Sequence, residues 1–330
     1  MEPVFDVVGI GNALVDVLAR VDDAFLVEHR LVKGSMCLLD AERAEALQRA
    51  MGPAVERSGG SAANTLAGLA SLGGRGAFIG RVGDDRLGRV FADDVRATGV
   101  AFTTAPAADG APTGRCLVAI TPDAERTMST LLGAAAELGP DDVDEAVVAS
   151  AAVTYLEGYL FEQDLARQAF DRAASAAASA GRLVAFTLSD SWCVDRSREE
   201  FLSFVASSVD LLFANDHELR LLYGTDDVDE ALGHAERHCS VVALTRGPAG
   251  STVASGGRRC SVAAQAVEEV VDTTGAGDLY AAGFLFGFTR GADPATCGRL
   301  GAAAAAEVIS HLGARPETSL AELVAPIAPT

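Results

Sequence analysis

The sequence is poor in basic residues. Of its 330 residues, 26 are Lys or Arg and 46 are Asp or Glu, so the formal net charge is −20. A chain with this charge repels a phosphate backbone, which argues against DNA or RNA as a partner. A small anionic ligand such as a nucleotide stays compatible with it, because a local group of N–H donors can override the field of the whole protein.

The sequence also lacks a paired cysteine motif and a long apolar segment. Its six cysteines are scattered without a C-x-x-C pair, which predicts free thiols in a reducing compartment. No apolar run is long enough to span a bilayer, and residues 4–10 are typical of a strand rather than of a secretory leader. We therefore expect a cytoplasmic protein without a membrane partner.

The order of predicted elements indicates an α/β fold in a single domain, residues 1–330. Apolar residues make up 49% of the chain, which is enough for a large core. Strands and helices alternate from residue 141 onward, which predicts a doubly wound, mostly parallel sheet flanked by helices. Residues 100–104, 114–121 and 126–132 predict short strands of a small second sheet. No G-x-G-x-x-G follows the first strand, so a Rossmann dehydrogenase lacks support.

Residues 272–278, with the sequence DTTGAGD, are the stretch most indicative of chemistry. They predict a turn of small residues that leads into an apolar helix. The first turn of a helix exposes unpaired N–H groups, and Gly275, Ala276 and Gly277 leave them open to an anion such as phosphate. Asp278 would repel this anion, so we interpret it as a base that takes a proton from an attacking hydroxyl group. The alternative is an ordinary glycine turn with Asp278 as the N-cap.

A second glycine turn precedes the helix predicted to begin at Ser61. Ser61 is its predicted N-cap. Asn64 follows one turn later, where its amide can face a group that docks against Gly59 and Gly60. A close contact between helix and strand, which tolerates only small residues, would explain the same pattern.

Three further groups of polar residues each allow two interpretations. Asn12 and Asp16 share a face of an extended strand, which suits a sugar or base but also a solvated hairpin. Asn215 and Glu218 resemble a capping box, and Glu218 could instead organise hydrated Mg²⁺. Arg126 lies in the predicted second sheet, where it either faces a substrate or is exposed to solvent.

Together, these motifs resemble those of the ribokinase-like (PfkB) family of small-molecule kinases. The matching segments are residues 11–16, 59–64, 215–218 (N-x-x-E), 245–247 (T-[KR]-G) and 272–285. They occur in the order and spacing of the family and cover about residues 4–315. Within the family, the first two segments look most like those of adenosine kinases.

The resemblance implies ATP-dependent phosphorylation of adenosine at its 5′-hydroxyl group, with Mg²⁺. Asp278 becomes the general base, and Gly275, Ala276 and Gly277 become the anion hole. The implied substrate residues are Asn12, Asp16, Met36, Gly59, Gly60, Ser61, Asn64, Arg126 and Tyr159, with Asp16 and Asn64 on the ribose and Arg126 over the phosphates. The implied nucleotide residues are Asn215, Thr245, Gly247, Thr274, Gly275 and Gly277, with Glu218 for the metal. Thr274 stands where the family more often has Asn.

The resemblance also implies a lid, built from about residues 13–39 and 100–132, that closes over the site and excludes water. It leaves open a requirement for a monovalent cation such as K⁺, and whether the protein is a monomer or a homodimer. The alternatives are a ribokinase or fructokinase acting on a free sugar, a kinase for inosine or guanosine, and a nucleoside-binding protein without catalysis.

Overall fold

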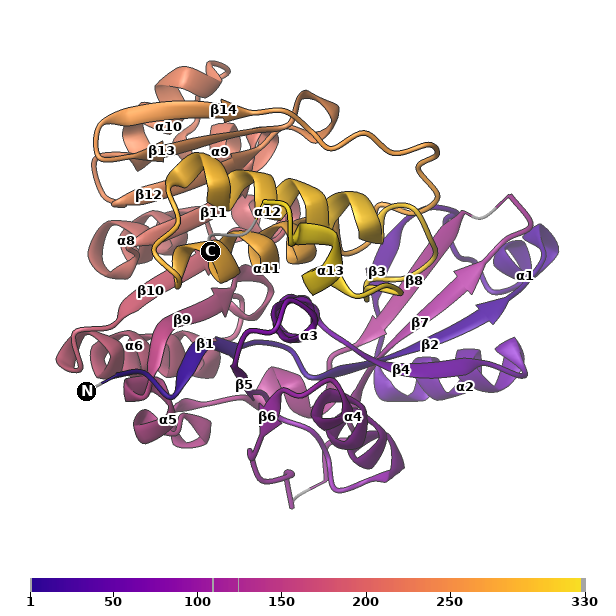
Figure 1. The fold of residues 1–330 in the computed structure, drawn as a ribbon. Helices are drawn as coiled ribbons and strands as arrows, with labels where there is room; N and C mark the ends of the chain where they lie inside the picture. The colour runs from indigo at the N-terminus through magenta and orange to yellow at the C-terminus, as the bar shows by residue number, and fades with distance from the viewer. Residues whose placement is uncertain (1, 109, 124, 328–330) are drawn as a thin grey trace.

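A nine-stranded β-sheet forms the centre of the molecule (Figure 1). The computed structural model describes residues 2–108, 110–123 and 125–327. The strands lie in the order β14-β13-β12-β11-β10-β9-β1-β5-β6, and the pairings are parallel apart from β12–β13 and β13–β14. The strands are β1 (Phe5–Ile10), β5 (Gly76–Ile79), β6 (Ala101–Phe102), β9 (Ala151–Glu157), β10 (Leu183–Thr187), β11 (Leu211–Asn215), β12 (Val241–Thr245), β13 (Ser251–Ser255) and β14 (Arg258–Val262).

Helices cover both faces of this sheet, because successive strand residues point to opposite faces. Val7 of β1 packs in one hydrophobic core and Val8 in the other. The first core includes α3 (Ser61–Ser71), α4 (Arg86–Ala97), α11 (Ala276–Phe288), α12 (Pro294–Val308) and α13 (Leu320–Val324). The second includes α5 (Glu145–Ala149), α6 (Asp164–Ser179), α7 (Ser191–Arg196), α8 (Arg198–Ser208), α9 (Asp216–Tyr223) and α10 (Val228–Ala235). The predicted α/β fold is confirmed.

A second sheet of five strands adjoins the first, in the order β3-β8-β7-β2-β4. Its strands are β2 (Leu14–Arg20), β3 (Met36–Leu38), β4 (Val55–Gly59), β7 (Gly114–Ile120) and β8 (Arg126–Leu131), accompanied by helices α1 (Asp23–Glu28) and α2 (Ala41–Met51). Figure 1 shows it beside the large sheet, on the right of the view. The expected small second sheet is therefore present.

Two details of this second sheet differ from the sequence prediction. The strand expected at residues 100–104 belongs to the large sheet, where β6 pairs with β5. Strand β4 was not predicted, because its sequence VERSG has no apolar alternation, yet it pairs antiparallel with β2. The sheet thus draws on residues 14–59 and 114–131 rather than on the expected 13–39 and 100–132. Its action as a lid stays a prediction.

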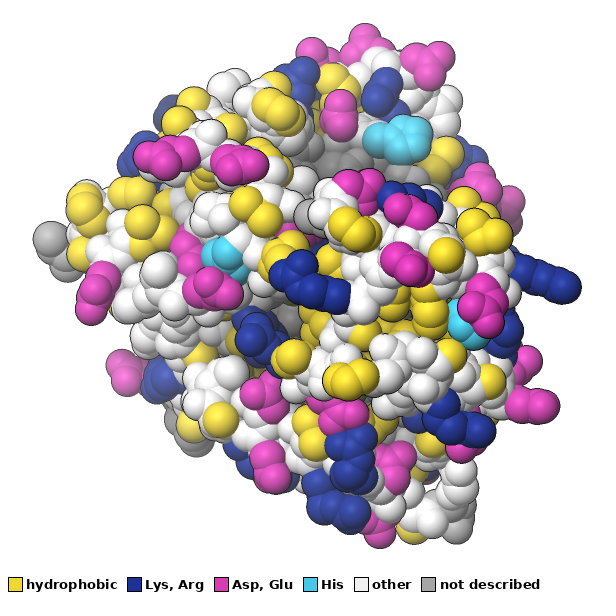
Figure 2. All heavy atoms as spheres, turned by 90° about the vertical axis from the view of Figure 1, so that its right-hand side faces the viewer, with side chains coloured by type: hydrophobic (Ala, Val, Ile, Leu, Met, Phe, Trp, Pro, Cys, Tyr) yellow, Lys and Arg dark blue, Asp and Glu magenta, His cyan; other side chains and the backbone are white. Residues whose placement is uncertain are grey.

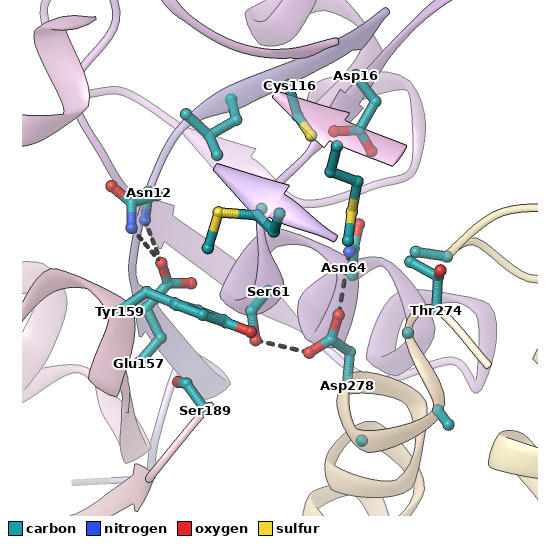
Figure 3. A pocket seen from close by; sticks show the side chains of 18 of the residues that line it. Asn12, Asp16, Ser61, Asn64, Cys116, Glu157, Tyr159, Ser189, Thr274 and Asp278 are labelled. Atoms are coloured by element: carbon teal, nitrogen blue, oxygen red, sulfur yellow. Dashed lines mark hydrogen bonds between the residues drawn. The ribbon is translucent and has the colours of Figure 1, made fainter. Parts of the chain in front are cut away.

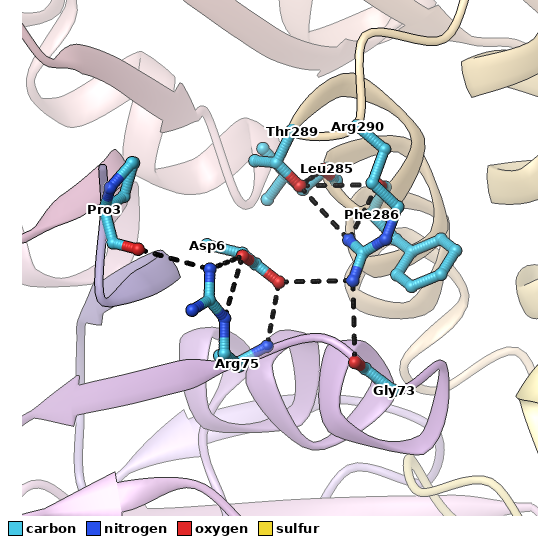
Figure 4. A network of polar contacts seen from close by, with 8 residues as sticks. All are labelled: Pro3, Asp6, Gly73, Arg75, Leu285, Phe286, Thr289 and Arg290. Atoms are coloured by element: carbon cyan, nitrogen blue, oxygen red, sulfur yellow. Dashed lines mark hydrogen bonds and ion pairs between the residues drawn. The ribbon is translucent and has the colours of Figure 1, made fainter. Parts of the chain in front are cut away.

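A charged network holds the far end of α11 against the large sheet (Figure 4). The buried carboxylate of Asp6 on β1 pairs with Arg75 at 2.9 Å and with Arg290 at 3.3 Å. Arg290 follows α11, and its guanidinium also stacks on Phe286, 3.7 Å from the ring centre. The network thereby fixes the helix that carries Asp278 at its other end. Within the described part of the chain, no helix is long and apolar enough to cross a membrane.

Candidate active site

A cavity of about 550 Å³ lies where the second sheet meets the carboxyl ends of strands in the large sheet. Residues at or just after the ends of β1, β9, β10, β11 and β12 line one side, and apolar residues of the second sheet line the other. Figure 2 turns the right-hand side of Figure 1 toward the viewer, and hydrophobic side chains appear at the centre of this face between charged ones. The position agrees with the rule that open α/β sheets bind ligands beyond the carboxyl ends of their strands.

Asp278 lies in the first turn of α11 and faces Ser61 and Asn64 of α3 (Figure 3). Its Oδ1 accepts a hydrogen bond from Ser61 Oγ at 2.6 Å, and its Oδ2 accepts one from Asn64 Nδ2 at 3.0 Å. Burial raises the pKa of Asp278, while the two hydrogen bonds and the charge of Arg315 lower it. The carboxylate is thus held in place by neutral donors.

The caps of the two helices differ from the sequence expectations. Gly275, with φ of 80°, is the N-cap of α11, so the alternative with Asp278 as N-cap is wrong. Gly60, with φ of 95°, is the N-cap of α3, so Ser61 is not the cap that the sequence predicted. A positive φ favours glycine, and it places Ser61 at the first helical position with its hydroxyl free to reach Asp278.

The turn before α11 is braced by Asp272. Its Oδ1 accepts hydrogen bonds from the backbone N and the hydroxyl of Thr274, at 3.0 and 2.7 Å. Its Oδ2 accepts one from the Gly313 backbone at 2.8 Å. The Thr274 hydroxyl is therefore committed to holding the turn, with Gly275, Ala276 and Gly277 on the cavity wall.

Arg126 of β8 reaches across from the second sheet to this turn. Its Nη2 lies 2.8 Å from Oδ2 of Asp272, and the two side chains are only 10% and 7% exposed. Its Nη1 also donates to the Thr274 hydroxyl at 3.4 Å. The alternative of a solvent-exposed Arg126 is therefore wrong, and the ion pair joins the second sheet to the turn before α11, beside the predicted anion hole.

Asp16 and Asn12 occupy the opposite wall of the cavity (Figure 3). Burial raises the pKa of Asp16 to about 6, against the lowering effect of Arg315 and Arg126. Among the described residues, none donates a hydrogen bond to either oxygen of Asp16, so the carboxylate is available to a ligand. Gly59 lies outside the lining but backs Asp16, since a Cβ there would lie 2.5 Å from that carboxylate.

Glu157 orients Asn12, and it was not identified from the sequence. Its Oε1 accepts from the backbone N and Nδ2 of Asn12, at 2.7 and 2.9 Å, and its Oε2 accepts from the Ala62 backbone at 2.7 Å. The backbone N–H and one side-chain N–H of Asn12 thus lie toward Glu157, and Oδ1, which has no partner among the described residues, is left as an acceptor. Burial raises the pKa of Glu157 to about 7. Its place as the last residue of a buried strand was the available signal.

The remaining wall combines a capping box with scattered residues. Asn215 caps α9, and both oxygens of Glu218 accept from it, at 2.7 and 2.9 Å, as the capping interpretation predicts. Burial raises the pKa of Glu218 to about 7. The other predicted residues on the lining are Met36, Gly60, Tyr159 and Thr245, whereas Gly247 lies outside it in an exposed turn. Among the described residues, no group of three or more His, Cys, Asp or Glu could hold a metal ion.

Arg315 was also missed by the sequence analysis. It lies in the loop after α12, on the cavity lining, and its Nε donates to Asn64 Oδ1 at 2.8 Å. Its Nη2 donates to the Ser58 hydroxyl at 2.9 Å and to the Ser58 carbonyl at 3.2 Å. A single arginine in an irregular loop has no sequence pattern that would select it.

Comparison with known proteins gives matches over most of the chain. A model of the pfkB family of carbohydrate kinases matches residues 34–320. The structure of adenosine kinase from Sinorhizobium meliloti is 52% identical, with a TM-score of 0.90, over 98% of this chain and 99% of that one. A probable sugar kinase from Rhizobium etli CFN 42 is 48% identical, with a TM-score of 0.91, over 98% of each chain. The 5-dehydro-2-deoxygluconokinase of Shouchella clausii (strain KSM-K16) is 29% identical over 281 residues, 81% of this chain and 85% of that protein.

Proposed function

The chain belongs to the pfkB family of carbohydrate kinases, and from that premise we propose that it transfers the γ-phosphoryl group of ATP to the 5′-hydroxyl group of adenosine. The family establishes a phosphotransferase that acts on a hydroxyl group. The identity of 52% with an adenosine kinase supports adenosine as the acceptor.

The observation that carries the proposal is the position of Asp278. It lies on the cavity lining beside the open turn of Gly275, Ala276 and Gly277, and two neutral donors hold its carboxylate. Asp278 accepts the proton of the 5′-hydroxyl as that oxygen attacks the γ-phosphorus. The new P–O bond forms, the bond from phosphorus to the β–γ bridging oxygen breaks, and ADP leaves with that electron pair. N–H groups at the start of α11 face the charge of the transferred group.

The opposite wall of the cavity suits a nucleoside. Asp16, which is free of protein donors among the described residues, accepts hydrogen bonds from the ribose hydroxyl groups, together with Asn64 and with Gly60 behind them. The second sheet presents an apolar surface for a purine ring, made of Leu14, Leu18, Met36, Leu38, Val118 and Met128. Asn12 and Tyr159 stand at the edge of this surface. A site built to pair with hydroxyl groups discriminates strongly against analogues that lack them.

Asn215, Thr245 and Thr274 form the nucleotide side of the site. Glu218 supplies one carboxylate, and both its oxygens already accept hydrogen bonds from Asn215. A single carboxylate of this kind fits a magnesium ion that keeps several waters and arrives with the triphosphate. Glu218 would hold such a hydrated ion through water. Magnesium supplies charge neutralisation for the phosphates when it is bound.

A substrate panel tests this proposal. Adenosine, inosine, guanosine, ribose and fructose are each incubated with ATP and Mg²⁺, ADP release is measured, and the product is identified by mass. We expect AMP from adenosine, and 5′-deoxyadenosine, which lacks the acceptor oxygen, serves as the matched control without turnover. Turnover of a free sugar together with no turnover of any nucleoside would refute the proposal.

A free sugar is the second candidate acceptor. The 48% identity with a probable sugar kinase and the similarity to 5-dehydro-2-deoxygluconokinase support it. Asp16 would then hold sugar hydroxyl groups in the same way, while the apolar surface of the second sheet would have no ring to cover. Comparison of kcat/KM for adenosine and fructose separates the two candidates.

A further inference from the structure

Arg315 has a place in the site that neither the family motifs nor the cavity chemistry above accounts for. It is a cation on the cavity lining, contributed by the loop between α12 and α13. Its two hydrogen-bonded partners come from separate elements, Ser58 from β4 of the second sheet and Asn64 from α3. Arg315 thus contacts both the second sheet and α3, the helix whose Asn64 donates to Asp278.

We propose that Arg315 is the positioning residue for Asp278: it fixes the amide of Asn64 so that Nδ2 donates to this carboxylate, and it places a cation on the cavity lining that Asp278 shares with Asp16. The inference rests on the proposed role of Asp278 as base. It adds a residue that acts through Asn64 and through charge, without touching the substrate.

Arg315 determines the orientation of the Asn64 amide. An arginine side chain donates hydrogen bonds and never accepts them. Because Arg315 Nε points at one end of the amide at 2.8 Å, that end must be Oδ1. The opposite end is then Nδ2, which donates to Asp278 Oδ2 at 3.0 Å. Without Arg315, the amide could rotate and present its oxygen to the carboxylate, and the two acceptors would repel each other.

The guanidinium itself is held by a further chain of contacts. Its Nη2 donates to the Ser58 hydroxyl, and that hydroxyl donates to Asp94 Oδ2 on α4 at 2.6 Å. The Ser58 backbone donates to the same oxygen at 2.7 Å. Asp94 therefore holds Ser58 in place, and Ser58 holds Arg315. The chain of hydrogen bonds continues through Asn64 to Asp278, the proposed base.

Arg315 also acts through its charge. Asp16 and Asp278 line one cavity, the charge of Asp278 raises the pKa of Asp16, and the charge of Arg315 lowers the pKa of both. Burial lowers the pKa of Arg315, while Asp94, Asp16 and Asp278 raise it. The other titratable groups that face Asp16 or Asp278 from neighbouring elements are Cys116 of β7, Arg126 of β8, Tyr155 and Glu157 of β9, and Tyr159 after β9.

The test measures kcat and KM for adenosine between pH 5 and 9 in Arg315→Met, Arg315→Lys and the native enzyme at saturating ATP. Loss of the positive charge in Arg315→Met raises the pKa of the carboxylates, so the acid limb of kcat/KM moves to higher pH. A shift of about one unit, the low end for a neighbouring charge, makes kcat/KM of the variant about tenfold lower than that of the native enzyme at pH 5, below both pKa values, and about fivefold lower at pH 6. Arg315→Lys retains the positive charge, so the acid limb of kcat/KM stays at the native pH, while KM for adenosine rises.

Arg290→Met is the matched control, because it removes an arginine at the opposite end of α11, away from the cavity (Figure 4). It lowers thermal stability and leaves the pH profile unchanged. The inference is overturned if the acid limb of Arg315→Met lies at the same pH as that of the native enzyme and its kcat/KM is within twofold of the native value. If Arg315→Met does not fold, Arg315→Lys provides the test. A KM for adenosine equal to that of the native enzyme in Arg315→Lys also overturns the inference.

Asp278→Asn separates this inference from the proposed function. If Asp278→Asn retains native turnover, the assignment of the base fails. If Asp278→Asn is inactive and Arg315→Met keeps the native pH profile, the base assignment survives and the role of Arg315 alone is refuted. Non-additive losses in Asn64→Ala, Arg315→Met and their double variant would support action through Asn64.

Discussion

The hydroxyl of Ser61 donates to Oδ1 of Asp278 at 2.6 Å, which joins the first residue of α3 to the first turn of α11. Gly60 makes this contact possible, because as the N-cap it leaves the Ser61 side chain free. The proposed base is therefore oriented by a neighbour that the sequence motif offered as a helix cap.

Replacing Asp278 with Asn tests the base directly. The variant keeps the shape of the side chain but cannot accept the proton, so kcat falls by roughly 10²–10⁴-fold. Because a buried carboxylate is replaced by a neutral amide, the midpoint of urea unfolding does not fall. Ser61→Ala, which removes only one donor, has a smaller effect on kcat. Native kcat in Asp278→Asn would contradict the mechanism.

Arg126→Met is expected to weaken the junction between the second sheet and the turn before α11. Removing one partner of a buried ion pair leaves Asp272 uncompensated, which costs about 3–5 kcal/mol of the free energy of unfolding. The same change loosens the turn around Thr274, so KM for ATP rises. Arg86→Met, which breaks an exposed ion pair with Glu56, serves as the control and costs at most about 1 kcal/mol. Equal losses in the two variants would argue against a special role for Arg126.

Asp16 predicts a pH dependence of acceptor binding. Burial raises its pKa to about 6, so the carboxylate gains a proton as the pH falls through 6 and becomes a weaker hydrogen-bond acceptor for the ribose hydroxyl groups. We expect kcat/KM for adenosine to decline about tenfold per pH unit well below pH 6, since the active form is the ionised one. Asp16→Asn lowers kcat/KM by about 10- to 100-fold at pH 8, the equivalent of 1.5–3 kcal/mol. In Asp16→Asn, kcat/KM declines less steeply below pH 6 than in the native enzyme. A pH profile of the variant with the same shape as the native one would exclude Asp16 as the titrating group.

Gly60→Ala is expected to disturb the acceptor side of the cavity. Gly60 has φ of 95°, and a Cβ there would lie 2.1 Å from the backbone oxygen of Asn12. Gly52→Ala is the control, because Gly52 also has positive φ, 71°, but a Cβ there meets nothing within 4 Å. Both variants carry backbone strain of about 1–3 kcal/mol. Gly60→Ala additionally raises KM for adenosine, and a native KM would show that Asn12 tolerates the contact.

Asp6→Asn is expected to reduce stability without changing catalysis. The change removes the charge that pairs with Arg75 and Arg290, far from the cavity (Figure 4). Loss of charged hydrogen bonds costs about 2 kcal/mol of the free energy of unfolding. Urea unfolding measures this cost, and KM values for adenosine and ATP provide the comparison. A large rise in KM would mean that the far end of α11 controls the position of Asp278.

The fold was largely readable from the sequence, because strand and helix periods are local signals. Strand β4 escaped prediction, since its polar sequence is held in place by pairing with β2 rather than by its own apolar pattern. The edge strand β6 was assigned to the wrong sheet, because two residues do not specify a partner.

The site was readable only in part. The turn before Asp278 is a contiguous motif, so its residues could be named in advance. Glu157 and Arg315 escaped because their roles depend on contacts with Asn12 and Asn64 in distant segments. Arg126 has its partner, Asp272, in a distant segment that local sequence does not reveal.

The contact between Ser61 and Asp278 spans 217 residues of chain. During synthesis, residues 1–278 must leave the ribosome before both partners exist outside it, so no nascent fragment ending before α11 contains the complete reaction centre. Recovery of turnover during refolding therefore reports the docking of α11 against α3, a contact that neither helix provides alone.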